Sequence, residues 1–213
     1  MEFVTPLTVV PKKLQATHKK WQKLAKSWDY SGPVAWRVKA GFTLKKHAPL
    51  VGPCYERFAY LQDWQFEDEP TTDSIVFWIP RLVPESTSKN VDEQRELLSA
   101  LRTRLELPEH HLNGFGSVAL VAGLILAHFK RVGETVPLDR LWVRTDTRDS
   151  GGYRLNLGYF DGCGLYCNGW VFGGRRGDGL GAFALGVELD HLGTRPNTSV
   201  TRFACPHCSH ELK

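Results

Sequence analysis

One segment of the chain, residues 149–187, is built almost without the residues that normally solvate a protein surface. It contains no Lys, Glu, Gln or Met, and this absence extends back to Thr135, although Lys, Glu and Gln together occur 29 times in the 213 residues. Eleven of the 20 glycines lie between residues 151 and 181. Because glycine adopts the positive φ angles that tight turns require, the glycine content predicts a compact β-region. It does not account for the missing Lys and Glu.

The polar and aromatic residues that remain in this segment share a property of their codons. Randomising the two adenines of an AAC codon reaches Asn, Tyr, Asp, His, Ser, Gly, Cys, Arg, Phe and several aliphatic residues, but never Lys, Glu, Gln, Met or Trp. We take the residues within this set as candidate ligand-binding residues. They are Tyr153, Asn156, Tyr159, Asp161, Cys163, Tyr166, Asn168, Phe172, Arg175, Arg176 and Asp178.

In this respect the segment resembles the variable region of the C-type-lectin-fold proteins diversified by retroelements, in which adenine-directed mutagenesis rewrites a ligand-binding face while the frame stays fixed. The resemblance implies a non-enzymatic display protein that recognises a protein or another macromolecular ligand through residues 153–178. It also implies a buried frame made of Trp142, Leu157, Trp170, Phe183, Leu185 and Val187.

The sequence departs from that family in two respects. Such variable regions usually lie at the extreme C-terminus, whereas 24 residues follow Leu189 here. The Glu-Pro-Asn and Trp-Asn-Asp calcium motifs of sugar-binding C-type lectins are absent. Calcium-dependent sugar binding is therefore not implied.

The expected secondary structure follows the same order over residues 70–190. Residues 74–80 are an apolar run closed by proline, which predicts a buried strand, and 54–66 are expected to be a strand or a short helix. Asn90 is placed to cap a helix over 90–105, and a second buried helix starts at Asn113 or Ser117 and ends at Gly133. Residues 138–147 and 181–189 read as strands.

We therefore expect the α+β fold class. The prediction is a C-type-lectin-like domain over 54–190, with two helices flanking a small, mainly antiparallel sheet with long loops, and with the variable-type segment at 150–180.

A basic N-terminal arm with a helix is expected over residues 1–53. Residues 1–50 carry a net charge of +8, so the rest of the chain carries −4. Within 12–28, Leu14, Trp21 and Trp28 are seven residues apart on one helix face, and lysines occupy much of the remainder. Such a helix binds nucleic acid or an anionic membrane surface, or else its tryptophans dock on the main domain while the lysines are solvated.

The tail, residues 191–213, contains Cys205 and Cys208 in the C-x-x-C spacing that lets two thiolates bind one Zn²⁺. His210 or His207 would add a nitrogen ligand, and a complete site needs a further group. The alternatives are a disordered tail and a redox-sensitive dithiol. Zinc is therefore a candidate cofactor.

Targeting signals are not evident in the sequence. The longest apolar run, 115–127, has 13 residues, too few for a membrane span of about 20. The N-terminus lacks a cationic head followed by an apolar core, and five cysteines are an odd number that suits reduced thiols. We expect a cytoplasmic protein without a transmembrane segment, with surface display by another route left open.

Enzymatic activity is not expected. Several Asp and His residues are present, but no spacing identifies a nucleophile with its base, a phosphate loop or a metalloprotease helix. The formylglycine-generating enzymes share the C-type-lectin-like fold and use a cysteine pair, but Cys163 and Cys167 do not reproduce their motif. The main alternative to ligand display is a zinc-containing nucleic-acid-binding protein that uses the lysine-rich helix.

Overall fold

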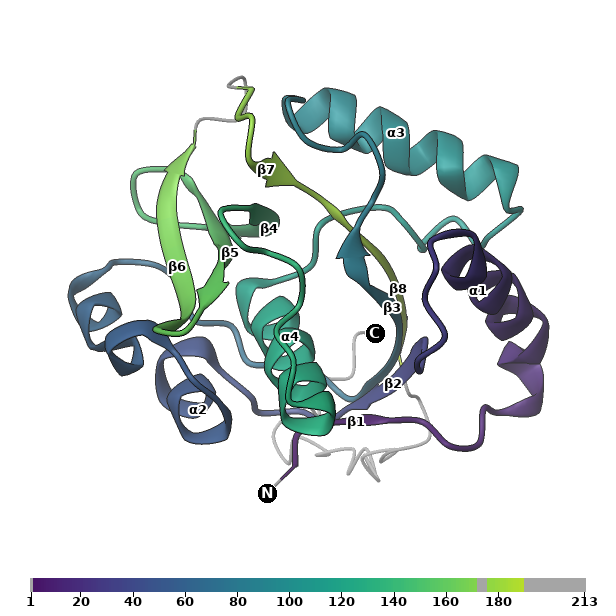
Figure 1. Cartoon of the computed structure of the whole chain (residues 1–213), viewed down its shortest axis with the longest axis horizontal. Coiled ribbons are helices and arrows are strands. Elements are labelled where there is room, and N and C mark those ends of the chain that lie inside the picture. The colour runs from purple at the N-terminus through teal and green to yellow at the C-terminus, as the bar shows by residue number, and fades with distance from the viewer. Residues whose placement is uncertain (1, 172–175, 190–213) are drawn as a thin grey trace, which may run out of the picture.

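Two four-stranded sheets form the framework of the protein (Figure 1). The computed structural model describes residues 2–171 and 176–189, and of Trp170 and Val171 it describes the backbone alone. The first sheet has the order β1-β2-β3-β8 and is antiparallel throughout: β1 (Val4–Pro6), β2 (Ala35–Val38), β3 (Ser74–Leu82) and β8 (Phe183–Leu189). The second has the order β6-β5-β4-β7: β4 (Trp142–Arg148), β5 (Arg154–Asp161), β6 (Gly164–Val171) and β7 (Leu180–Gly181). In the second sheet β4 and β7 pair in parallel.

The helices pack around these sheets. They are η1 (Lys12–Leu14), α1 (Gln15–Ser27), α2 (Leu44–Val51), η2 (Tyr55–Asp63), α3 (Val91–Arg104) and α4 (Val118–Val132). In Figure 1, α4 lies between the two sheets, while α1 and α3 lie on the other side of the first sheet. The protein is therefore of the mixed α+β class, as expected.

The buried strand β3 separates two hydrophobic clusters. Its side chains alternate, so that Val76 and Trp78 join the cluster shared with α4 and the second sheet. Ile75, Phe77 and Ile79 join the cluster shared with α1 and α3. Both faces of the first sheet are covered, which explains why residues 74–80 form a continuous apolar run.

Both predicted helices of the central region are present with the expected ends. The Asn90 side chain accepts a hydrogen bond from the Glu93 N–H, and the Glu93 carboxylate accepts from the Asn90 N–H, which forms a capping box. At the start of α4 the Ser117 hydroxyl accepts from the Leu120 N–H, and Gly133, at φ 73°, ends the helix in the left-handed conformation. These boundaries agree with the sequence pattern.

The first and last strands of the region 74–189 lie side by side. β3 and β8 pair antiparallel from Ser74 with Leu189 to Trp78 with Leu185, and a β-bulge precedes the pair Leu82 with Phe183. The chain between β3 and β8 contains the two helices and the second sheet. It therefore leaves the first sheet at β3 and returns to it at the neighbouring strand, β8.

The N-terminal segment, residues 1–53, carries the expected helix, and of the two alternatives for that helix the structure shows docking on the main domain. β1 and β2 are part of the first sheet, and α1 packs on β3. Trp21 is fully buried and stacks on Phe77, with ring centroids 5.9 Å apart. The helix is present as predicted, but its apolar face completes the core, because without it one face of β3 would be exposed to water.

Segment 54–66 forms the 3₁₀-helical stretch η2, and this stretch covers the free edge of β6. The Tyr60 hydroxyl donates to the Cys167 carbonyl at 2.9 Å and accepts from the Cys167 N–H at 3.0 Å. Burial raises the pKa of Tyr60, so the hydroxyl keeps the proton that it donates. The edge strand is thereby shielded from pairing with another chain. In the described part of the chain, no helix has the length and apolar character needed to span a membrane.

Candidate ligand-binding face

The second sheet has an apolar inner face and a polar, aromatic outer face. Val143, Leu155, Leu157 and Leu165 point into the core next to α4. The residues between them point outward, because side chains alternate along a strand. The strand register aligns these outward residues in two rows. Trp142, Gly158 and Tyr166 form one row, and Arg144, Asn156 and Asn168 form the other.

A row of aromatic rings crosses this outer face. The ring centroid of Tyr159 lies 4.9 Å from that of Trp142 and 6.5 Å from that of Tyr166. Tyr166 in turn stacks on Tyr55 at 4.0 Å. Tyr159 is 38% exposed. The face therefore presents ring surface to solvent, which is typical of contact sites for other molecules.

The backbone at the centre of this row is strained. Tyr159 has a φ of 46°, in the left-handed region that non-glycine residues rarely adopt, and its N–H donates to the Leu141 carbonyl. A Cβ at the preceding Gly158 would lie 2.2 Å from the Leu141 oxygen, so only glycine allows this close approach. The irregularity turns the Tyr159 ring outward, and such strain concentrates at functional sites.

A pocket of about 270 Å³ opens beside Trp142 and Tyr159. The residues that line it are Arg140, Trp142, Asn156, Tyr159, Asn168, Gly177, Gly179 and Leu180. Asn156 is only 3% exposed, and its Oδ1 has no hydrogen-bond partner. A buried amide oxygen without a donor is costly, so a ligand that supplies a donor would be favoured there.

Two buried arginines, Arg144 and Arg154, also lie on the outer face. Arg144 donates from Nε to Gln94 Oε1 at 2.7 Å, and Gln94 itself donates to the carbonyls of Ser86 and Leu180. Arg154 pairs with Asp146 at 3.0 Å. Burial, with the nearby Arg154 charge, lowers the pKa of Arg144 to about 10, and it remains charged at neutral pH. This network holds the start of α3 against the sheet and places positive charge behind Asn156.

The structure brings part of the predicted ligand-binding set together. Tyr159 is exposed, while Tyr166 and Asn168 are half-buried on the same outer face. Asn156 is buried at the pocket. Phe172 and Arg175 lie outside the described residues.

The other predicted residues lie at the ends of the strands. Tyr153 is half-buried next to the β4–β5 turn, where its N–H donates to Asp149. Asp161 and Cys163 are exposed at the β5–β6 turn, where the Asp161 carboxylate accepts from the Cys163 N–H. Arg176 is exposed and pairs with Glu93 of α3, and the exposed Asp178 lies 3.4 Å from the Ser88 hydroxyl.

Among the described side chains, the expected frame faces the core except at Trp142. Leu157, Phe183 and Leu185 are buried, and the half-buried Val187 packs on the core. The Trp170 side chain lies outside the description. Trp142 was expected to be buried, but it is half-buried and lines the pocket. Its side chain points to the same outer face of β4 as that of Arg144, because side chains two residues apart on a strand lie on one face.

Sequence reasoning missed three residues of this face: Tyr55, Arg140 and Trp142. Trp142 was placed in the frame as part of what the resemblance implied. The alternation of Trp142 with the apolar Val143 was the signal that could have placed it on the face. Tyr55 comes from a distant segment and carried no local signal.

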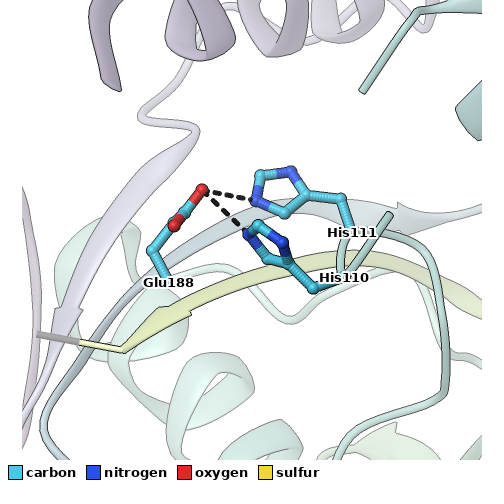
Figure 2. A group of neighbouring side chains, drawn as sticks. All are labelled: His110, His111 and Glu188. Carbon is cyan, nitrogen blue, oxygen red and sulfur yellow. Dashed lines mark hydrogen bonds and ion pairs between the residues drawn. The ribbon is translucent and has the colours of Figure 1, made fainter. Parts of the chain in front are cut away.

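A second cluster joins His110 and His111 to Glu188 of β8 (Figure 2). The Nε2 atoms of both rings meet the same oxygen, Glu188 Oε1, at 3.1 and 3.0 Å. Burial lowers the pKa of His111, which is fully buried. Among the described residues, this is the group with three side chains close enough to share a metal ion.

The contacts of His111 oppose a metal at this cluster. The Trp21 indole N–H donates to His111 Nδ1 at 3.2 Å, so Nδ1 must carry a lone pair and Nε2 the proton. A metal on Nε2 would require the proton to sit on Nδ1, facing the indole N–H, whereas metal-bound histidines normally donate from their other nitrogen to an acceptor. These hydrogen bonds instead link α1, the 110–111 loop and β8.

The described cysteines do not form a reactive pair. Cys54 and Cys167 are buried, and burial raises the pKa of Cys54 to about 12, which keeps the thiol protonated. Cys163 is exposed. The proposed zinc ligands Cys205, Cys208 and His210 lie outside the described residues, so the zinc site stays a prediction.

Comparison with protein-family models, with curated proteins and with solved structures finds no match to this chain.

Proposed function

We propose that this chain is a ligand-binding display protein whose binding face is the outer face of β4, β5 and β6 with the segment that follows β6. The observation that carries the proposal is the pocket beside the exposed Tyr159 and the half-buried Trp142, with Asn156, whose buried Oδ1 has no partner, in its lining. Tyrosine and arginine anchors of this kind dominate binding energy at protein interfaces. The ligand class that we propose is a protein.

We further propose a C-type-lectin-like fold for residues 74–189. The order of one strand, two helices, a sheet and a final strand paired with the first strand supports this assignment. Diversification by a retroelement is part of the same proposal. It is supported by the composition of 149–187 and by the separation of its side chains into a core-facing frame and an outer face.

A random peptide library selected on the wild-type protein tests this proposal. Selected peptides should bind the triple variant Tyr159→Ser, Tyr166→Ser, Arg176→Ser at least about 10-fold more weakly, since loss of anchor contacts costs ~2 kcal/mol or more. The matched control carries Gln22→Ser, Lys23→Ser and Lys26→Ser on α1, and peptide affinity should be unchanged on it. Peptides that bind the triple variant as well as wild type would contradict the proposal.

A second candidate function is polyanion binding by α1. Lys19, Lys23 and Lys26 are exposed and line a groove with the 30–34 segment. Lys20 is already engaged, because its ammonium donates to the Glu106 carbonyl at 2.7 Å. The buried Trp21 shows that the apolar face of the helix serves the core, so only the lysine face is available to a nucleic acid.

A further inference from the structure

The pocket beside Trp142 has the size of a single side chain. Its volume of about 270 Å³ lies below the range of roughly 300–1,000 Å³ that is usual for sites of whole small molecules. The rings of Trp142 and Tyr159 are in contact, with centroids 4.9 Å apart and planes tilted by 44°, and together form one aromatic wall, while Gly177, Gly179 and Leu180 line a further part of the pocket. An aromatic wall favours a flat ring.

The polar groups in the pocket form a matched donor and acceptor. Asn156 Nδ2 donates weakly to the Arg154 carbonyl at 3.5 Å, which leaves Oδ1 as a buried acceptor without a partner. Asn168 lies directly across from Asn156 in the sheet, and its Oδ1 accepts from the Gly169 N–H at 2.7 Å. The Asn168 Nδ2 is therefore left to donate. A hydroxyl group, which both donates and accepts, fits this pair.

The charges near the pocket select against a cation. Arg140 lines the pocket, and the buried Arg144 is the cross-strand partner of Asn156. A lysine or arginine side chain would enter a site with two positive charges close by, although the aromatic wall alone would suit it. A neutral ring with a hydroxyl does not face this repulsion.

We propose that the pocket binds a tyrosine side chain of a protein ligand. The ring packs against the wall formed by Trp142 and Tyr159, and the phenol O–H donates to Asn156 Oδ1 while its oxygen accepts from Asn168 Nδ2. This assignment rests on the proposed function of the outer face, and it adds the chemistry of the residue that the pocket recognises.

The test is an NMR titration of the full chain with N-acetyltyrosinamide and N-acetylphenylalaninamide, followed through the Trp142 indole N–H. The tyrosine amide should bind about 5- to 10-fold more tightly, because it satisfies the buried oxygen. Asn156→Leu should reduce this ratio to about one. Asn156→Asp, which keeps an acceptor, should retain the preference. Tyr166→Ser, on the same face but outside the pocket, is the control and should leave the ratio unchanged.

Several results would overturn the assignment: equal binding of the two amides by the wild-type protein, no binding of either, or tighter binding of N-acetyllysinamide or adenosine. The same holds for a tyrosine preference that persists in Asn156→Leu when circular dichroism shows a wild-type fold. These results leave the peptide-library test unaffected. Failure of the pocket assignment is thus distinguishable from failure of the display function.

Discussion

Tyr159 connects backbone strain to the binding face at the scale of one residue. A tyrosine in the left-handed region costs about 1–2 kcal/mol relative to an ordinary conformation. The neighbouring contact of Gly158 with the Leu141 carbonyl fixes this geometry, and the result is an outward ring against Trp142. A residue selected for stability alone would be glycine or asparagine.

Replacing Tyr159 with glycine should therefore separate binding from stability. We expect the free energy of unfolding of Tyr159→Gly in urea to stay within about 1 kcal/mol of wild type, because relief of strain offsets the lost ring contacts. Affinity for library-selected peptides should fall at least about 10-fold. Glu85→Gly, also at positive φ, is the control for strain relief and should leave peptide affinity unchanged. Unchanged affinity in Tyr159→Gly would argue against this ring as an anchor.

His111 predicts how stability depends on pH. Burial lowers its pKa below the ordinary 6.5, so the ring is neutral in the folded protein while the unfolded chain takes up a proton below about pH 6.5. The unfolded state then binds more protons, and stability falls as pH drops from 7 towards 5, by up to ~1.4 kcal/mol per pH unit for one such group. Buried His128 has a pKa lowered by the same cause and adds to the slope.

The contribution of His111 is measured by urea unfolding at pH 7, 6 and 5. In His111→Gln the side-chain amide offers Trp21 an acceptor and Glu188 a donor but does not titrate. The variant should lose stability less steeply with acid than wild type does. An identical slope in the two proteins would mean that His111 does not titrate in this range.

At the scale of elements, the sequence predicted the parts that depend on local chemistry. The capped helix after Asn90, the buried helix ended by Gly133 and the apolar strand at 74–80 are present at the expected places, because caps and hydrophobic patterns are local signals. Docking of α1 on the main domain was one of the two expected alternatives, but the placement of β1 and β2 in the first sheet was not predicted. This placement depends on pairing of β2 with β3, about 40 residues away, which no local pattern specifies.

The site shows the same limit. Codon logic selected Tyr159, Tyr166 and Asn168, and all three lie on one face. It could not find Tyr55 or Arg140, because the contact of Tyr55 with Tyr166 depends on how η2 folds over the edge of β6. It also could not show that Asn156 is buried, since burial of this residue depends on packing in three dimensions.

The lysine face of α1 has its own test at this scale. If it binds nucleic acid, wild-type protein should bind single-stranded DNA at low salt. The variant Lys19→Gln, Lys23→Gln, Lys26→Gln should bind about 10-fold or more weakly with a flatter salt dependence, because each lost phosphate contact removes about one unit of counterion release. Fluorescence anisotropy at several salt concentrations measures both quantities. Equal affinity and slope would leave α1 as a helix that serves the core alone.

At the scale of the whole molecule, the two sheets differ in which of their faces are covered by the core. The first sheet is covered on both faces and carries the pair β3–β8, whereas the second uses its inner face for the core, and its outer face carries the proposed binding site. Changes on the outer face therefore alter few core contacts, and exposed substitutions usually cost less than ~0.5 kcal/mol. This separation is what a protein with a rewritable surface requires.

The central claim, a diversified outer face on a fixed frame, is tested most directly by sequencing the DNA that flanks the gene. The account predicts a near-repeat of the DNA that encodes 150–187, differing from it only at adenines, together with a reverse-transcriptase gene. The differing codons should include those of Tyr159, Tyr166 and Asn168 and should spare those of Leu155 and Leu157. A flanking sequence without such a repeat, or one whose differences fall equally on the core-facing leucines, would contradict it.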